Sequence, residues 1–242
     1  MISGKKMLVV SAHPADYVWR SGGTIAHYIK HGAEVKVLVL SFGIRGESND
    51  LWNQEGATAE SVKEIRQSET LAAAKILGLD GLDFWHMEDY PLELTREHED
   101  KLVREIRAMQ PDIILTHDKF DILNPDHNMV SDFTFRCSVM SNSNGVRIEG
   151  TETSKQMRIY GFEPHQTELS NYKPGIFVDI TDGYDQKVAA MKCFKAQGHL
   201  IEYYTQRAFM RGNHARRISG NNSYKYAESF ACFFPVVSDE LL

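Results

Sequence analysis

Side chains able to bind a metal are concentrated in two short segments of the chain. The first contains His13 and Asp16, and the second, Asn124-Pro125-Asp126-His127, contains a further histidine. A catalytic zinc site uses three protein ligands of the His, Asp or Glu type and keeps one position open for water or substrate. His13, Asp16 and His127 supply such a set, so we expect them to bind Zn²⁺.

Each segment follows an apolar run that predicts a buried strand, at residues 7–10 before His13 and at residues 113–116 before the loop ending at His127. Open α/β sheets bind ligands outside the carboxyl ends of their strands. Two such loops on adjacent parallel strands can converge on one ion. Simpler interpretations stay open, because a histidine near a strand end is often only hydrogen-bonded and Asp16 alone would cap the following helix.

Strand and helix patterns alternate along much of the chain. Further strands are predicted at residues 34–40, 82–85, 160–162 and 176–180, and helices at residues 24–31, 61–77, 97–109 and 186–197. Strands separated by helices of this length imply a parallel sheet with right-handed crossovers. The predicted fold is α/β, a Rossmann-like three-layer fold with a mostly parallel sheet. Because no linker, repeat or low-complexity segment interrupts it, we expect residues 1–242 to form one domain.

Composition excludes several classes of protein. The net charge of −6 argues against a nucleic-acid partner, since phosphate binding favours a basic surface. No apolar run is long enough for a signal peptide core or a membrane span, so we expect a cytoplasmic protein without a membrane partner. Cys137, Cys193 and Cys232 are odd in number and widely spaced, and we expect them to be reduced thiols without a chemical role.

The two metal-binding segments resemble motifs of the LmbE-like, or PIG-L, family of zinc-dependent de-N-acetylases. The family motifs read His-Pro-Asp-Asp-Glu and His-Pro-Asp-His, where this chain has His13-Pro14-Ala15-Asp16-Tyr17 and Asn124-Pro125-Asp126-His127. The resemblance implies zinc ligation by His13, Asp16 and His127. It also places Ala15 at the position of the family's general base, whose loss typically costs about 10²–10⁴-fold in rate.

Other segments resemble the 4-oxalomesaconate hydratase branch of the same superfamily, a zinc-dependent branch that acts in bacterial gallate catabolism. They are Trp19-Arg20-Ser21-Gly22-Gly23, residues 41–48, Phe162-Glu163-Pro164-His165-Gln166 and Glu202-Tyr203-Tyr204-Thr205. This similarity covers residues 7–234 and includes the alanine at Ala15. It implies a zinc-dependent hydratase for a small anionic polycarboxylate, and a homo-oligomer.

Three residues are candidates for catalysis in place of Ala15. Glu47 ends a Gly-rich loop after the second predicted strand, beside the expected zinc loop. His165 has an ordinary pKa suited to proton transfer near neutrality. Asp126 is a turn residue, a residue that orients a ligand, or a substitute base. The sequence does not decide which of Glu47 and His165 takes the proton from water.

Arginines argue for an anionic substrate. Arg20 and Arg45 follow strand ends near the expected metal, and a planar guanidinium binds a carboxylate through two hydrogen bonds. Asn124 and Tyr204, which lie in the segments compared above, are further candidates for substrate binding. Most of the arginines late in the chain are expected on a solvated helix surface.

These residues predict a zinc-dependent hydratase that adds water to a conjugated oxo or enol polycarboxylate. Zinc would act as a Lewis acid on a substrate oxygen. One alternative is a zinc-dependent de-N-acetylase of an N-acetyl amino sugar or a related amide, with Glu47 or Asp126 as the base. Another is a zinc-binding protein without catalysis.

Overall fold

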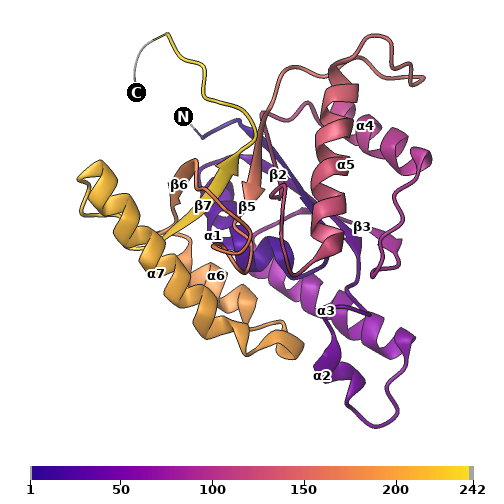
Figure 1. The fold of residues 1–242 in the computed structure, drawn as a ribbon, viewed down its shortest axis with the longest axis vertical. Helices are drawn as coiled ribbons and strands as arrows, with labels where there is room; N and C mark the ends of the chain where they lie inside the picture. The colour runs from indigo at the N-terminus through magenta and orange to yellow at the C-terminus, as the bar shows by residue number, and fades with distance from the viewer. Residues whose placement is uncertain (1, 240–242) are drawn as a thin grey trace.

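The computed structural model describes residues 2–239 (Figure 1). Its strands are β1 (Lys6–Ser11), β2 (Glu34–Ser41), β3 (Gly81–Met87), β4 (Ile113–His117), β5 (Arg158–Phe162), β6 (Ile176–Asp179) and β7 (Ala227–Cys232). Its helices are α1 (Asp16–Lys30), α2 (Asn49–Trp52), α3 (Ala59–Leu77), α4 (Arg96–Met109), α5 (Pro125–Asn142), α6 (Tyr184–Met191) and α7 (Leu200–Ser219), with a 3₁₀ turn η1 (Lys195–Gln197).

All seven strands form one sheet in the order β3-β2-β1-β4-β5-β7-β6. The first five strands in this order are parallel to one another, whereas β7 is antiparallel to both β5 and β6. The predicted α/β fold with a mostly parallel sheet is confirmed. The order also makes β1 a neighbour of both β2 and β4, which brings the loops after these three strands together.

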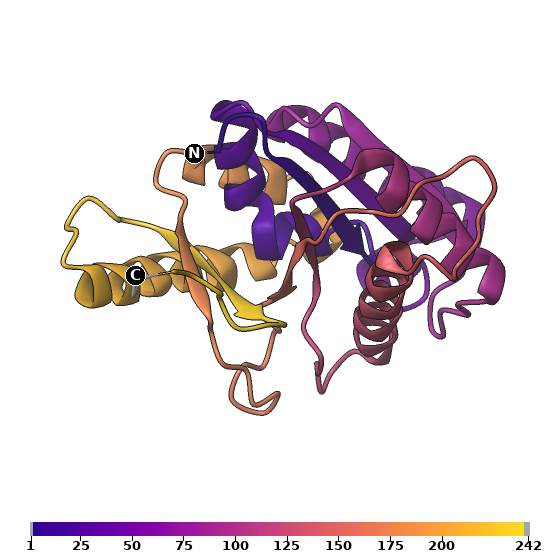
Figure 2. The same ribbon diagram turned by 90° about the horizontal axis from the view of Figure 1, so that it is seen from above.

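Helices cover both faces of the sheet, as Figures 1 and 2 show. Val9 and Val37 face a core shared with α1, α3 and α6. Leu8 and Leu38 face the opposite core, shared with α4 and α5. Side chains of a strand alternate between faces, so an uninterrupted apolar run such as residues 7–10 is what a strand buried on both faces requires. The predicted three layers are therefore present.

The first helix begins at Asp16, not at residue 24 as predicted, so Gly22 and Gly23 lie inside it. The buried Glu228 carboxylate accepts hydrogen bonds from the backbone N–H groups of Gly23 and Thr24, at 3.0 and 2.8 Å. A Cβ atom on Gly23 would lie 2.5 Å from Ile180 Cδ1. The glycine pair therefore permits close packing of the helix on its neighbours and does not mark a loop.

The predicted helix at residues 186–197 is also shorter than expected. It ends at Met191, and η1 follows after a break at Phe194, which has ψ of 83°. This conformation coincides with complete burial of the Phe194 ring beneath the Arg66 guanidinium. The locally helical pattern is thus interrupted at a residue whose side chain is fully buried.

Helix α5 lies where no regular element is predicted, and α7 lies where the late arginines were expected on a helix surface without predicted bounds. The pattern of α5 is weak because Ser131, Thr134, Ser138 and Ser141 occupy buried positions, where an amphipathic helix ordinarily has apolar residues. None of the helices within the described part of the chain is both long and apolar enough to cross a membrane.

Candidate active site

The loops after β1, β2, β3 and β4 meet at the carboxyl edge of the sheet around a cavity of about 300 Å³. Helix α7 and the segment after β5 close its other side. Predicted site residues that line this cavity are Asp16, Arg20, Glu47, Asn124, His127, His165 and Tyr204. Residues that are far apart in the chain are brought together by the strand order, as expected for the ligand edge of an open α/β sheet.

The three predicted metal ligands converge in the interior. Nδ1 of His13 lies 3.2 Å from Asp16 Oδ2, and Nε2 of His127 lies 3.3 Å from Asp16 Oδ1. One ligand atom each from these three residues and from Glu47 all lie within 4.8 Å of one another. Among the described residues, His13 Nδ1 and His127 Nε2 are buried without a hydrogen-bond partner. Buried imidazole nitrogens ordinarily have one, so this donor set fits a divalent metal.

Neighbouring carboxylates orient both histidines. Nδ1 of His127 lies 2.9 Å from Asp121 Oδ2, which directs the opposite ring nitrogen toward Asp16. Nε2 of His13 lies 3.4 Å from Asp126 Oδ2. Histidines that bind metals commonly use their second ring nitrogen in this way. Asp121 was not identified from the sequence, although it precedes the second motif by three residues.

Asp126 is placed differently from the catalytic role predicted for it. Its carboxylate accepts hydrogen bonds from the backbone N–H groups of Tyr90 and Leu92, at 2.9 and 3.0 Å. Within the described residues it is not part of the cavity lining. This arrangement lets Asp126 hold the loop after β3 and orient His13, as the second of its predicted roles requires.

His117, at the end of β4, is a buried site residue that the sequence analysis missed. Its Nε2 accepts a hydrogen bond from the Ala12 backbone N–H at 3.0 Å, and its ring stacks on His127 with centroids 4.0 Å apart. Burial holds the pKa of His117 well below its ordinary value, and His127 lowers it further. The side chain is therefore neutral and supports the ring of His127. The position of His117 at the end of a predicted strand was the feature of the sequence that could have indicated it as a site residue.

Glu47 lies between the metal ligands and a buried arginine. Its Oε1 is 3.3 Å from His13 Nδ1, and its Oε2 is 3.5 Å from Arg66 Nη2. Burial and the nearby Asp16 raise the pKa of Glu47, but His13 and Arg66 outweigh them, so the net pKa lies below its ordinary value. Glu47 is thus an ionised carboxylate in the cavity wall.

The two arginines predicted for substrate binding differ in position. Arg20 is buried, pairs with Asp16 and lies 3.5 Å from Asp121 Oδ2. Its Nε is buried without a hydrogen-bond partner among the described residues. The Arg45 side chain is 50% exposed and pairs with Glu88 at 2.5 Å. Because Arg45 is also not among the described residues lining the cavity, the geometry does not support its predicted role.

The remaining predicted site residues in the cavity lining are His165, Tyr204 and Asn124. The Tyr204 hydroxyl lies 2.9 Å from Nδ1 of His165, and the Tyr204 ring stacks on Trp19. Burial, with Arg20 and Arg207, lowers the pKa of His165 to about 4, so the imidazole is neutral at pH 7. The Asn124 side-chain oxygen caps α5 by accepting from the His127 N–H at 3.3 Å.

Family comparison agrees with this geometry. The model of the PIG-L family, described as GlcNAc-PI de-N-acetylase, matches residues 8–138, which carry both metal-binding motifs. The chain belongs to the PIG-L family. The resemblance noted in the sequence is thereby confirmed. As a PIG-L protein it departs from the motif at Ala15, which is fully buried at the start of α1.

The chain is similar to relatives with two different activities, hydration and deacetylation. The chain is 39% identical to a 4-oxalmesaconate hydratase of Pseudomonas putida over 98% of this chain and 92% of that protein. It matches the crystal structure of GalB, the 4-carboxy-2-hydroxymuconate hydratase of Pseudomonas putida, with a TM-score of 0.93 and 38% identity, over 98% of this chain and 100% of that one. A diacetylchitobiose deacetylase of Thermococcus kodakarensis is 29% identical over 80% of this chain and 70% of that protein.

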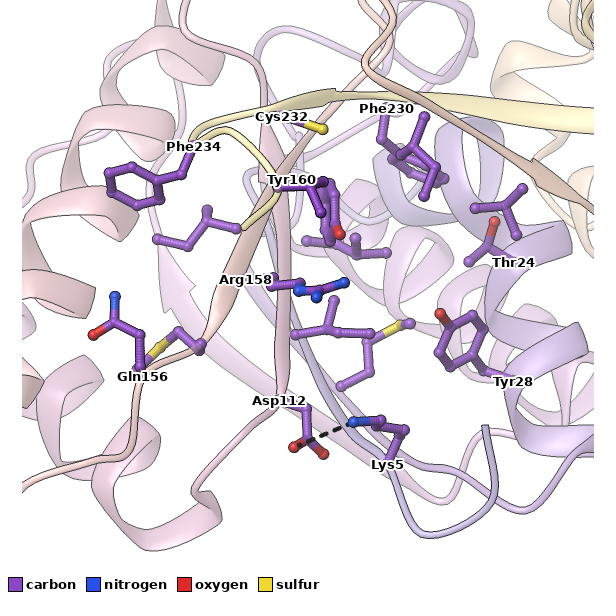
Figure 3. A pocket seen from close by; sticks show the side chains of 18 of the residues that line it. Lys5, Thr24, Tyr28, Asp112, Gln156, Arg158, Tyr160, Phe230, Cys232 and Phe234 are labelled. Atoms are coloured by element: carbon purple, nitrogen blue, oxygen red, sulfur yellow. Dashed lines mark ion pairs between the residues drawn. The ribbon is translucent and has the colours of Figure 1, made fainter. Parts of the chain in front are cut away.

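A larger cavity of about 620 Å³ lies at the opposite edge of the sheet (Figure 3). Residues at the amino ends of the parallel strands line it, among them Met7, Ile113 and Arg158. The Lys5–Asp112 ion pair, at 3.9 Å, lies at its rim in Figure 3. None of the residues predicted to bind metal or substrate is in its lining, as far as residues 2–239 are concerned. We therefore place the active site in the smaller cavity.

Proposed function

We propose that the protein is a zinc-dependent hydratase that adds water to a conjugated oxo or enol polycarboxylate. The observation that carries the proposal is similarity to a hydratase over 98% of the chain, both in sequence and in fold. The same family contains deacetylases, but the chain lacks the carboxylate at Ala15 that those enzymes would use as a base. A substrate similar to 4-oxalmesaconate or 4-carboxy-2-hydroxymuconate follows from the activities of these two hydratases.

His13, Asp16 and His127 would hold the zinc ion. Their donor set is the one catalytic zinc prefers, and two of their buried nitrogens lack any other partner among the described residues. When bound, zinc supplies a Lewis acid that polarises a substrate oxygen and draws electron density from the conjugated double bond.

Glu47 is the proposed general base. Its carboxylate is ionised, lines the cavity and faces the metal ligands, so it can accept a proton from a water molecule held there. The water oxygen forms a bond to the electron-poor alkene carbon, the π electrons move to the adjacent carbon, and that carbon receives a proton. Base and acid roles of this kind require a group within hydrogen-bond reach of the moving proton.

His165 is the proposed partner for the proton that reaches carbon. It is neutral in the substrate-free site. A substrate carboxylate placed beside it would favour the imidazolium form, because an opposite charge raises the pKa of histidine. The Tyr204 hydroxyl at 2.9 Å fixes the orientation of the ring during this change.

Arg20 is the proposed site for a substrate carboxylate. Its guanidinium lies in the cavity wall, and its unpartnered Nε provides a donor in addition to the groups that contact Asp16 and Asp121. Asn124, which also lines the cavity, could contribute a side-chain N–H because its oxygen already caps α5. Both residues would select an anionic, oxygen-rich ligand over a neutral sugar amide.

De-N-acetylation is the alternative, because Glu47 could serve as a base for amide hydrolysis. One experiment separates the two activities. The zinc-loaded protein is offered 4-carboxy-2-hydroxymuconate while the loss of conjugated ultraviolet absorbance is followed, and diacetylchitobiose while acetate release is followed. We expect loss of absorbance without acetate release. His127→Ala is the matched control and should show neither change. Acetate release that depends on His127 would overturn the hydratase assignment.

A further inference from the structure

A second cluster of metal-binding side chains lies at the far end of α1. His27 lies in the last turn of α1, and His31 is the residue that caps the carboxyl end of this helix. Their ring centroids are 4.5 Å apart. Asp182, in the turn after β6, meets both rings. Its Oδ1 is 2.6 Å from His27 Nδ1, and its Oδ2 is 3.0 Å from His31 Nε2.

The three side chains together form a donor set for a transition metal. One nitrogen from each histidine and one carboxylate oxygen all lie within 4.8 Å of one another. Ligand atoms at zinc bond lengths, each about 2 Å from a common ion, lie within about 4 Å of one another, so modest side-chain rotations would complete the site. Histidine nitrogens combined with a carboxylate oxygen are a donor set that zinc sites in proteins commonly use.

We propose that His27, His31 and Asp182 form a second binding site for a divalent transition metal, with Zn²⁺ as the ion we would test. The site has three protein ligands and is partly exposed, so water would complete the coordination. Imidazole and carboxylate donors suit Zn²⁺, Ni²⁺ and Cu²⁺ better than Mg²⁺ or Ca²⁺, which prefer sites made of oxygen atoms alone.

Lys30 is the group that competes with the metal. Its Nζ lies 3.4 Å from Asp182 Oδ2 and also donates to the Asp182 carbonyl oxygen. The Lys30 side chain is 53% exposed, so it can swing into solvent at little cost. A bound divalent ion would replace this single charge at Asp182. Removal of Lys30 should therefore strengthen metal binding. If ion pairs alone held the two histidines and Asp182 together, removal of Lys30 would instead weaken the cluster.

The site is distinct from the active site and lies at the other end of the same helix. Asp16 begins α1 and His27 follows eleven residues later, a separation of roughly 16 Å along the helix axis at 1.5 Å per residue. One ion cannot serve both sets of ligands. A metal at the second site would join the end of α1 to the turn that leads into α6, and would thereby stabilise the folded chain in proportion to its occupancy.

Metal counting tests the proposal. The full chain and its variants are dialysed to equilibrium against buffered Zn²⁺, and zinc per chain is measured by atomic absorption. We expect His31→Gln and Asp182→Asn to bind one zinc ion fewer than the parent. Lys30→Gln should bind as many zinc ions as the parent, at the same or a lower concentration of free zinc. His127→Ala, which disables the proposed active site, should retain the zinc that depends on His31.

Thermal unfolding provides a second measurement. Zinc added beyond the active-site equivalent should raise the Tm of the parent and of Lys30→Gln, but not that of His31→Gln. The comparison covers the free zinc concentrations that saturate Lys30→Gln. If the parent and His31→Gln contain equal amounts of zinc over that range, the proposal of a second site is wrong. Loss of all zinc in His127→Ala would also overturn it. Neither result depends on whether the protein is a hydratase.

Discussion

The guanidinium of Arg66 lies behind the carboxylate of Glu47, with Nη2 3.5 Å from Oε2. Arg66 belongs to α3, is fully buried and also meets Glu69 Oε2 at 3.2 Å. Neither partner of such a buried pair can turn away without leaving a charge unpaired. The other oxygen of Glu47 is thereby held 3.3 Å from His13 Nδ1, facing the proposed metal ligands.

Replacement of Glu47 tests its role as the base. Gln has the same size but cannot accept the proton from water at neutral pH, so Glu47→Gln should lower kcat by at least about 10²-fold. Zinc content measured by atomic absorption should stay near that of the parent, because His13, Asp16 and His127 remain. If Glu47→Gln instead loses its zinc, Glu47 is a fourth ligand. If it turns over normally while His165→Ala is inactive, the base is His165.

Replacement of Arg66 tests positioning. The positive charge of Arg66 lowers the pKa of Glu47, so Arg66→Met should raise that pKa. The base must be ionised to act, and the acid limb of the kcat/KM profile should therefore move to higher pH. Arg66→Lys, which keeps the charge but not the fork of donors, should move the limb less.

Arg66→Met also leaves Glu69 buried without its arginine partner, so lower stability is expected. Thermal unfolding must be measured alongside the pH profile, and the assay run below the transition of the weaker variant. An unchanged acid limb in a folded Arg66→Met protein would show that Arg66 serves structure alone.

Removal of the metal ligands should abolish both zinc binding and activity. His13→Ala, Asp16→Ala and His127→Ala each leave two ligands of a three-ligand site, which is insufficient for tight binding. Chelation of the parent should give the same loss of hydration, reversed by added zinc. A variant that keeps its active-site zinc in metal analysis would remove that residue from the ligand set.

Arg20 and Arg45 provide a matched pair for substrate recognition. Arg20→Lys should weaken kcat/KM for a polycarboxylate by about 1.5–3 kcal/mol, the value of a hydrogen bond to a charged group. Arg45→Lys should leave kcat/KM nearly unchanged because its side chain pairs with Glu88 outside the cavity. Steady-state kinetics of both variants measure this contrast. A large effect at Arg45 would require a loop movement on substrate binding.

Gly23 and Gly22 provide a matched pair for packing of α1. A Cβ atom on Gly23 would lie 2.5 Å from Ile180 Cδ1 and 2.8 Å from its Cβ, so Gly23→Ala should cost about 1–3 kcal/mol. A Cβ atom on Gly22 would lie 3.6 Å from Lys187 Cγ, an ordinary contact. Gly22→Ala should therefore be neutral, or stabilising by up to about 1 kcal/mol from helix propensity. Denaturant unfolding compares them directly.

Local sequence patterns were sufficient for the parallel core of the sheet and for the metal-binding motifs. Residues 7–10 and 113–116 are apolar on both faces, a pattern that a doubly covered strand requires whatever surrounds it. His13, Asp16 and His127 could be identified because their chemistry depends on residue type and on short spacing. The missing base at Ala15 was instead implied by resemblance to the PIG-L motif, and Glu47 was proposed to replace it because it follows the neighbouring strand.

Tertiary structure alone decided which distant groups support those residues and where flexible side chains point. Arg66 reaches Glu47 because α3 packs against the loop after β2, and no spacing along the chain encodes that contact. Arg45 and Asp126 were assigned to the site by proximity in sequence, yet one pairs with exposed Glu88 and the other binds backbone after β3. The direction of a side chain depends on the path of its loop and on partners far away in the chain. Neither can be read from residue type, whereas strand burial and ligand chemistry can.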